Sequence, residues 1–188
     1  MQYLLDQYRE EMFGKDEETK EEPEHFHRVT LYKYGWHWAL VMWPWSGWVV
    51  PVARSGSTTK TKIPCFRASR NEPDKAEGVA GQTWVRNRRV PVFNLPNLNI
   101  ESPSEPDIEE YAKQTFVSEK WMYNRIQKHK KGPQARSLLG IPLETKGKSW
   151  GVLVVDSRSQ ESIGLKKVSK SYSSQAYYSV LSRLLEKL

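Results

Sequence analysis

Apolar and polar positions alternate along residues 28–34, RVTLYKY, and the β-branched and aromatic side chains there favour a β-strand. Val29 and Leu31 fall on one face of this strand, and Thr30 and Tyr32 fall on the other. A second strand is predicted at residues 47–56, GWVVPVARSG. Turn-forming Pro, Ser and Gly residues precede it. The pattern therefore predicts a long hairpin with tryptophans at its tip.

A second hairpin is predicted near the C-terminus. Apolar runs at residues 137–144 and 149–156 flank the sequence Thr-Lys-Gly-Lys, which has the chemistry of a turn at 145–148. A loop with a short strand is also expected within residues 57–69, and a short strand is expected at residues 90–95.

Helical periodicity marks four further segments. The first, residues 1–13, has an apolar stripe made by Tyr3, Leu4, Tyr8, Met12 and Phe13. The second, residues 75–89, is a glycine turn followed by a helix. The third is a helix that Ser118 caps at its N-terminus and that runs to about residue 130. The last, residues 166–188, repeats apolar side chains at four-residue steps: Val168, Tyr172, Ala176, Val180, Leu184 and Leu188, with Tyr177, Leu181 and Leu185 beside them.

This order of elements predicts an α+β fold, in which helices flank a central antiparallel β-sheet as a sandwich with long N- and C-terminal helices. Residues 1–24 are expected to be a helix and an acidic linker, and residues 25–188 are expected to form one domain. The 188-residue length suits one domain of this kind.

Charge is distributed unevenly along the chain. Residues 1–24 carry nine acidic and three basic side chains, a net charge of −6. Because the whole chain has a net charge of +7, residues 25–188 carry +13. A body this basic favours an anionic ligand or surface, although a solvated basic surface explains the same count.

Two motifs resemble those of GAF domains, which are small-molecule sensory modules. EGVAGQTWVRNRRVPVFNLPN is similar to the middle segment of that family, where a G-x-x-G turn opens a helix. SLLGIPLETKGKSWGVLVVDS resembles the C-terminal hairpin of the family, and residues 28–188 follow its order of elements. The resemblance implies a GAF- or PAS-like sandwich, a pocket between the sheet and the middle helices, and terminal helices that pair between subunits.

The resemblance also implies where a ligand would bind and how two chains would pair. The candidate ligand-binding residues are Arg67, Arg70, Trp84, Arg86, Phe116 and Trp121. An arginine fork suits a phosphate or carboxylate, whereas the aromatic residues could equally be ordinary core. The candidate dimer-helix residues are Leu181, Leu184 and Leu188.

The sequence shows no recognisable catalytic motif, and we expect no enzyme, no resident cofactor and no metal site. Its single cysteine, Cys65, cannot form an internal disulfide or the two-thiol system of the GAF-type free methionine sulfoxide reductases. Phe66 follows it where bilin-binding members have histidine.

Five of the eight tryptophans lie within thirteen residues: Trp36, Trp38, Trp43, Trp45 and Trp48. Three interpretations stay open: the tip folds over its own domain, packs on a partner that includes a second copy of the chain, or inserts into a membrane interface.

Two hypotheses for function follow. In the first, the chain is a non-catalytic GAF-type regulatory domain of a larger signalling protein, which binds a small, anionic ligand and dimerises. In the second, it is a protein-interaction or membrane-docking module that uses residues 36–48. We expect a cytoplasmic location, with a tether to the inner face of a membrane as an option, and no nucleic-acid partner.

Overall fold

The computed structural model of the protein describes residues 1–13, 27–35, 47–55, 63–99, 101–129, 135–158, 179–183 and 185. Their centre is one antiparallel sheet with the strand order β3-β2-β1-β6-β5-β4. The strands are β1 (His27–Gly35), β2 (Trp48–Arg54), β3 (Phe66–Arg67), β4 (Val90–Val92), β5 (Ser137–Thr145) and β6 (Lys148–Ser157). The predicted fold class is confirmed by this sheet and its helices.

Both predicted hairpins are present, and they lie side by side in this single sheet. Strands β1 and β6 join them in an antiparallel register that sets Leu31 opposite Leu153 and Tyr32 opposite Val152. The second hairpin turns more tightly than predicted. Lys146 and Gly147 alone form its loop, with φ values of 51° and 71°, because a two-residue turn with both φ values positive matches the twist of the strands.

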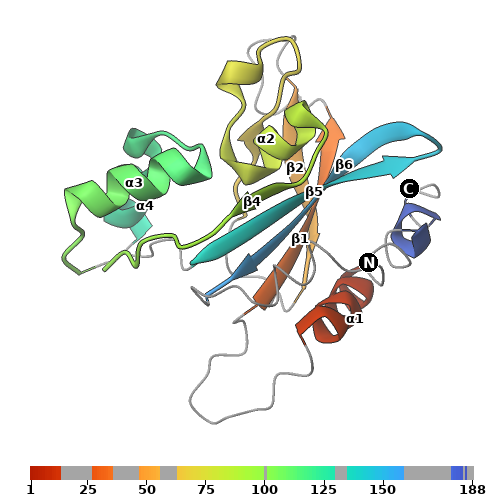
Figure 1. Ribbon diagram of the computed structural model, residues 1–188, viewed down its shortest axis with the longest axis horizontal. Coiled ribbons are helices and arrows are strands. Elements are labelled where there is room, and N and C mark those ends of the chain that lie inside the picture. The colour runs from red at the N-terminus through yellow and green to blue at the C-terminus, as the bar shows by residue number, and fades with distance from the viewer. Residues whose placement is uncertain are drawn as a thin grey trace.

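The helices divide between the two faces of the sheet (Figure 1). Helix α2 (Gly78–Arg86) packs on one face, with the short 3₁₀ helix η2 (Pro73–Lys75) just before it. Helix α1 (Gln2–Phe13) and the helical residues 179–183 and 185 lie on the other face. Helices α3 (Glu105–Thr115) and α4 (Glu119–His129) pack on each other at one end of the sheet.

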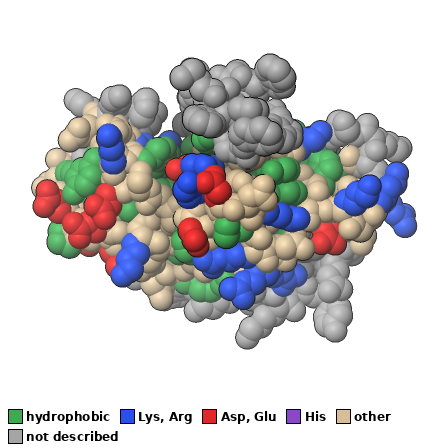
Figure 2. Space-filling view, turned by 90° about the horizontal axis from the view of Figure 1, so that it is seen from above, with side chains coloured by type: hydrophobic (Ala, Val, Ile, Leu, Met, Phe, Trp, Pro, Cys, Tyr) green, Lys and Arg blue, Asp and Glu red, His purple; other side chains and the backbone are tan. Residues whose placement is uncertain are grey.

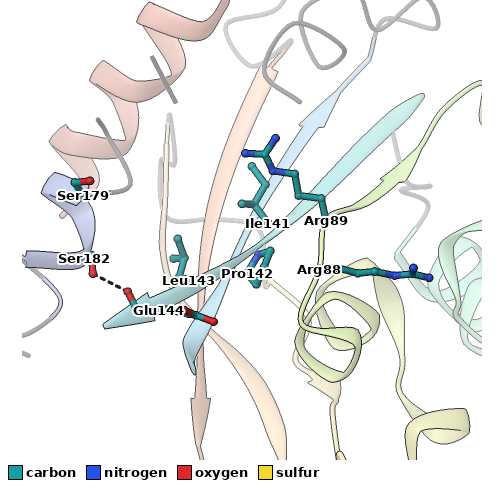
Figure 3. A pocket seen from close by; sticks show the side chains of 8 residues that line it. All are labelled: Arg88, Arg89, Ile141, Pro142, Leu143, Glu144, Ser179 and Ser182. Atoms are coloured by element: carbon teal, nitrogen blue, oxygen red, sulfur yellow. Dashed lines mark hydrogen bonds between the residues drawn. The ribbon is translucent and has the colours of Figure 1, made fainter. Parts of the chain in front are cut away.

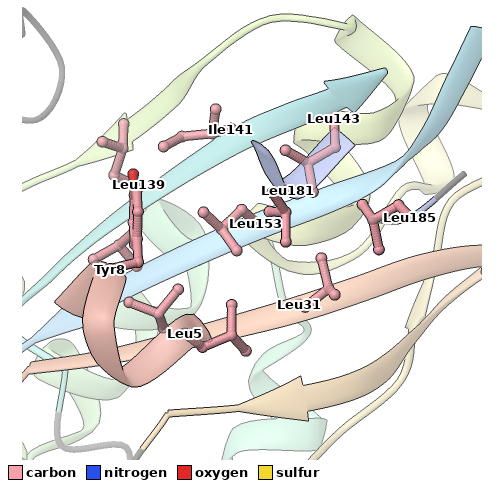
Figure 4. Packing of buried hydrophobic residues seen from close by; sticks show 11 residues of the cluster. Leu5, Tyr8, Leu31, Leu139, Ile141, Leu143, Leu153, Leu181 and Leu185 are labelled. Atoms are coloured by element: carbon pink, nitrogen blue, oxygen red, sulfur yellow. The ribbon is translucent and has the colours of Figure 1, made fainter. Parts of the chain in front are cut away.

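The α1 face of the sheet carries a continuous apolar core (Figure 4). Leu31 of β1 and Leu153 of β6 are fully buried there beneath Leu5 and Tyr8 of α1. The predicted apolar stripe of this helix is therefore only partly right. Tyr3 is 71% exposed, because Leu5 and not Tyr3 faces the sheet.

The predicted apolar face of the C-terminal helix is also displaced by one position. Val180 is 50% exposed, whereas Leu181 and Leu185 are buried in the same core as Leu5. Leu184 and Leu188 lie outside the described residues. Long terminal helices are not confirmed, since α1 has 12 residues and only residues 179–183 and 185 are described as helical near the C-terminus.

The helix predicted to begin at Ser118 is present as α4, and a further helix, α3, precedes it with a sharp break between the two. Phe116 adopts a left-handed conformation with φ 58°, which ends α3. The backbone N–H of Trp121 then donates to Ser118 Oγ at 3.2 Å, so Ser118 caps α4 as predicted. The two helices bury their own apolar cluster, which includes Ile108 and Met122.

Most of the tryptophan-rich tip lies outside the described residues. Trp48 begins β2, whereas Trp36, Trp38, Trp43 and Trp45 lie outside the described residues. Within the part of the chain that the structure describes, no helix has the length and apolar character needed to cross a bilayer.

Candidate ligand-binding site

The first residue of α2, Gly78, contacts both strand β3 and the turn between α3 and α4. Gly78 has φ +66°, and a Cβ placed on it would come within 2.6 Å of the Phe66 ring. Its N–H donates to the carbonyl oxygen of Phe116 at 2.7 Å. Only glycine accommodates both this φ and this approach, so the G-x-x-G signal of the sequence has a direct structural cause.

On the α2 face, the Trp84 ring contacts one aromatic ring and one guanidinium group. Its ring lies 4.1 Å from the Tyr34 ring at an interplanar angle of 13°. The guanidinium of Arg70 lies 4.5 Å from the Trp84 ring centre and donates to Ser149 Oγ at 2.8 Å. Trp84 is 5% exposed, and its Nε1 is buried with no hydrogen-bond partner among the described residues. Two of the predicted ligand residues, Arg70 and Trp84, are therefore in contact.

The other predicted ligand residues have separate partners. Arg67 forms an ion pair with Glu72. Arg86 lies over the ring of Phe116 at 5.2 Å, so these two predicted residues also contact each other. Trp121 lies 6.4 Å from the Phe66 ring. The predicted arginines thus each engage a neighbour of their own rather than forming a shared fork, and whether these positions bind a ligand stays a prediction.

A different group of arginines gathers on the sheet, and we call Arg28, Arg54 and Arg125 the arginine cluster. Strand pairing sets Arg28 opposite Asp156 and Arg54 opposite Thr30. Arg28 Nε and one of its terminal nitrogens each lie 2.7 Å from Asp156 Oδ1, and Arg54 Nε donates to Thr30 Oγ1 at 2.9 Å. Arg125 enters from α4, where its guanidinium lies 5.2 Å from the Trp121 ring centre.

These charges act on one another, and the three arginine side chains are each partly buried. The Asp156 carboxylate raises the pKa of Arg28 against the opposing effect of burial. Burial, together with repulsion from Arg54 and Arg28, lowers the pKa of Arg125. Burial also raises the pKa of Tyr32, which lies on the same face of β1 as Arg28. Three guanidinium groups against one carboxylate leave this region with an excess of positive charge.

Two further groups border the arginine cluster. Tyr111 of α3 is buried and donates from its hydroxyl to the Ala135 carbonyl at 3.0 Å. Its pKa is raised by burial first and by the Asp156 carboxylate second. Cys65 is half-buried, and it also acts on the pKa of Tyr32. In the described part of the chain, no three His, Cys, Asp or Glu side chains come together as metal ligands.

Surface charge is also separated along the molecule. Figure 2 shows acidic side chains gathered at the α3 end, where Glu105 and Asp107 lie in the first turn of the helix. Lys and Arg side chains gather at the opposite end of the same view. The arginine cluster therefore adds a shielded positive region to a surface that is already polarised.

Sequence reasoning missed the arginine cluster, although part of the signal was present. Arg28, Thr30 and Tyr32 are every second residue of β1, so the sequence predicts that they share one face of the strand. The partners Arg54 and Asp156 come from β2 and β6, and only the register of three strands brings them to that face.

No known protein family and no curated protein matches the chain by sequence. Solved structures do match it. A type II free methionine-R-sulfoxide reductase from Thermoplasma acidophilum aligns over 98% of this chain and 94% of its own, with a TM-score of 0.50 and 13% identity. The GAF domain of an Acinetobacter phosphoenolpyruvate-protein phosphotransferase aligns over 84% of this chain and 66% of its own, with a TM-score of 0.40 and 15% identity. A Staphylococcus aureus NreA protein, mutated in its nitrate binding site, aligns over 85% of this chain and 83% of its own, with a TM-score of 0.46 and 16% identity.

The fold is GAF-like, as the two sequence motifs predicted. One prediction is wrong, namely that the chain is not an enzyme. The Thermoplasma protein is a reductase, and it shares this architecture over nearly the whole chain. The lack of a familiar catalytic motif around Cys65 is therefore no ground for excluding catalysis, because this fold supports both chemistry and ligand binding.

Proposed function

We propose that the protein is a small-molecule-binding regulatory domain and that the arginine cluster binds a small anion. The observation that carries the proposal is the convergence of Arg28, Arg54 and Arg125 on one shielded face with Asp156 as the carboxylate among them. Guanidinium groups suit planar or tetrahedral oxyanions because their N–H groups form a rigid fork. An anion here would offset the mutual repulsion of Arg125 with Arg28 and Arg54.

A route from this site to the C-terminal helix supports a regulatory role. Arg125 belongs to α4, and the turn before α4 holds α2 through the Phe116–Gly78 hydrogen bond. At the other end of α2, Asn87 Nδ2 donates to Glu144 Oε1 at 3.2 Å, and Ser182 Oγ donates to the Glu144 carbonyl at 2.6 Å. Anion binding that moves α4 would reach the C-terminal residues through these contacts.

The experiment is a thermal-shift titration with nitrate, phosphate, sulfate and acetate at constant ionic strength. An anion at one hundred times its Kd stabilises by about 2.7 kcal/mol, which corresponds to a Tm increase of about 5–10 °C for a chain of this size. We expect Arg125→Gln to abolish the increase. The matched control is Lys113→Gln, which removes one exposed positive charge from α3 and should leave the increase intact.

The result against the proposal would be a Tm that no anion raises, or an increase that Arg125→Gln preserves.

The homodimer expected from the sequence is tested separately, by light scattering. Leu181 is buried within its own chain, so a dimer through the terminal elements would cover the exposed residues Tyr3 and Val180 instead. A Val180→Asp variant should then shift the chain to monomer.

One observation favours membrane docking as a second function. The ends of the tryptophan-rich connection, at Gly35 and Trp48, lie at the same end of the sheet as the turn that carries exposed Lys146 and Lys148, since β1 pairs with β2 and β6. Basic side chains at a surface attract anionic lipid at about 1 kcal/mol each. Co-sedimentation with phosphatidylserine vesicles should fall in a Lys146→Glu, Lys148→Glu variant, and equal pelleting would remove this function.

A further inference from the structure

The arginine cluster contains N–H donors that have no acceptor, and these donors indicate which class of anion it takes. Arg54 donates from Nε to Thr30 Oγ1 at 2.9 Å, and its two terminal nitrogens have no acceptor among the described residues. The Arg125 guanidinium lies 5.2 Å from the Trp121 ring centre but forms no hydrogen bond or ion pair within the described part of the chain. Both side chains are partly buried, so they favour a ligand that accepts from both.

Tyr32 supplies a further donor on the same face of the sheet. It lies two residues after Thr30 on β1, and Arg54 lies opposite Thr30 on β2, so Tyr32 and Arg54 are diagonal neighbours on one face. Diagonal neighbours lie about 7–8 Å apart, a separation that long side chains can span. Tyr32 is only 4% exposed, and its hydroxyl has no hydrogen-bond partner among the residues that the structure describes. A buried hydroxyl of this kind favours an acceptor that a ligand brings.

A chain of aromatic contacts holds Arg125 over the face that carries Tyr32. The Phe66 ring lies 6.0 Å from the Tyr32 ring and 6.4 Å from the Trp121 ring. The Arg125 guanidinium lies over Trp121 in turn. Because the donors belong to two strands and to a helix, they approach a ligand from more than one side. This arrangement suits the four oxygens of a tetrahedral anion better than the three of a planar anion.

The charge of the cluster favours a dianion over a monoanion. Asp156 is the only carboxylate among the described residues that acts on the pKa of Arg28 or of Arg125. Arg28 directs Nε and one terminal nitrogen to this carboxylate at 2.7 Å each, so one of the three positive charges is neutralised. The two that remain match the charge of phosphate or sulfate, whereas nitrate or acetate would neutralise only one of them.

The arginines at the edge of β5 do not offer a comparable site. A cavity of about 490 Å³ there is lined by Arg88, Arg89 and Glu144, among others (Figure 3). The two arginine side chains extend in different directions in Figure 3, and the Ser182 hydroxyl already donates to the Glu144 carbonyl at 2.6 Å. A carboxylate in the lining opposes an anion, so the arginine cluster is the better anion site of the two.

We propose that the arginine cluster selects a tetrahedral dianion of the phosphate or sulfate class, and that Tyr32 contributes to this selectivity. The inference rests on the anion site proposed above and narrows its ligand. The dianion accepts from Arg125 and from the terminal nitrogens of Arg54, and the Tyr32 hydroxyl donates to a further oxygen. Arg28 stays paired with Asp156 and supplies no hydrogen bond that the selectivity requires.

The experiment is a calorimetric titration of the full chain with methyl phosphate and methyl sulfate at constant ionic strength. Because the second pKa of a phosphate monoester is about 6, methyl phosphate is a dianion at about pH 8, whereas methyl sulfate has a similar shape and remains a monoanion. We expect methyl phosphate to bind at least about tenfold more tightly, because its additional charge faces partly buried guanidinium groups. Nitrate in the same series reports whether the cluster binds monoanions.

A pH series separates charge from shape. The affinity of methyl phosphate should fall about fivefold between about pH 8 and about pH 5, because the ligand loses its second charge in this range. Sulfate stays a dianion throughout, so it controls for titration of the protein groups that act on the cluster, namely Asp156, Tyr32, Tyr111 and Cys65. Its affinity should change by about twofold or less.

Pairs of variants test the donors. Tyr32→Phe keeps the ring and should weaken methyl phosphate about fivefold, more than it weakens methyl sulfate, because hydrogen bonds to a charged acceptor are the stronger ones. Tyr123→Phe is the matched control, since Tyr123 packs in a different apolar cluster, and it should change the affinity by about twofold or less. Arg54→Gln should weaken methyl phosphate at least about tenfold, whereas Arg88→Gln, at the edge of β5, should change it by about twofold or less.

Three results would overturn the inference: equal affinities of the wild-type chain for methyl phosphate and methyl sulfate, an affinity for methyl phosphate that does not change with pH, or a Tyr32→Phe variant that keeps the wild-type ratio of the two affinities. If the wild-type chain binds nitrate as tightly as the dianions, the anion site proposed earlier survives and this inference does not. If no anion of the series binds, both fail.

Discussion

Replacing Asp156 by asparagine tests both the stability and the chemistry of the arginine cluster. The carboxylate is buried, with its side chain 7% exposed, and Arg28 directs two nitrogens at 2.7 Å to one of its oxygens. Asparagine keeps a similar shape but carries no charge. Arg28 would then remain shielded from water beside Arg125, and the Arg28 side chain is only 22% exposed.

The expected cost is about 3 kcal/mol in the free energy of unfolding. Breaking a buried ion pair from one side costs about 3–5 kcal/mol, and the lower end applies because the asparagine oxygen still accepts a weaker hydrogen bond. Urea denaturation measures this change. Glu144→Gln is the matched control, since Glu144 is exposed and, among the described residues, its carboxylate accepts a hydrogen bond from Asn87 at 3.2 Å. Its cost should stay below about 1 kcal/mol.

The same variant should respond more strongly to anions than the wild type. Without Asp156 the cluster has no carboxylate of its own, so nitrate or phosphate should recover part of the lost stability. Sodium gluconate at equal ionic strength provides the control for general screening, because its anion is larger than those tested. A loss below 1 kcal/mol, or equal recovery in all salts, would refute the view that these charges are shielded and anion-seeking.

Three other predictions concern the fold. Gly140→Ala should cost about 1–3 kcal/mol, because its Cβ would lie 1.9 Å from Thr83 Oγ1, and a Thr83→Ala background should remove most of that cost in a double-mutant cycle. Leu5→Ala should cost about 2–4 kcal/mol in urea denaturation, whereas Tyr3→Ala, at a 71% exposed position, should cost less than about 0.5 kcal/mol. Stability should fall as pH rises above about 10, because burial raises the pKa of Tyr32 above that of the unfolded chain. Tyr32→Phe should flatten that alkaline decline, and an unchanged profile would contradict it.

The sequence predicted the two hairpins and the helix that begins near Gly78 because their signals are local. Alternation along β1 depends on which side chains a single strand turns to each face, and the structure confirms it. The glycine in the turn of the second hairpin is likewise a local signal, because Gly147 adopts the positive φ of 71° that a tight turn requires. Even the cap at Ser118 follows from a few neighbouring residues.

The sequence predicted less accurately which face of each terminal helix is buried. Both Tyr3 and Val180 belong to regular apolar stripes, yet both are exposed, because Leu5 and Leu181 occupy the limited space above the sheet. Periodicity shows that a helix has an apolar side but does not fix its rotation about its axis to within one position.

The candidate site depended most on tertiary structure. Arg28, Arg54 and Asp156 come from three strands, and Arg125 comes from a helix after a break at Phe116. The sequence by itself determined the strands, the glycine turns and an excess of positive charge. Only the folded chain decided which arginines share one shielded face, because electrostatic coupling depends on distance in space and on burial, and neither quantity is local in the sequence.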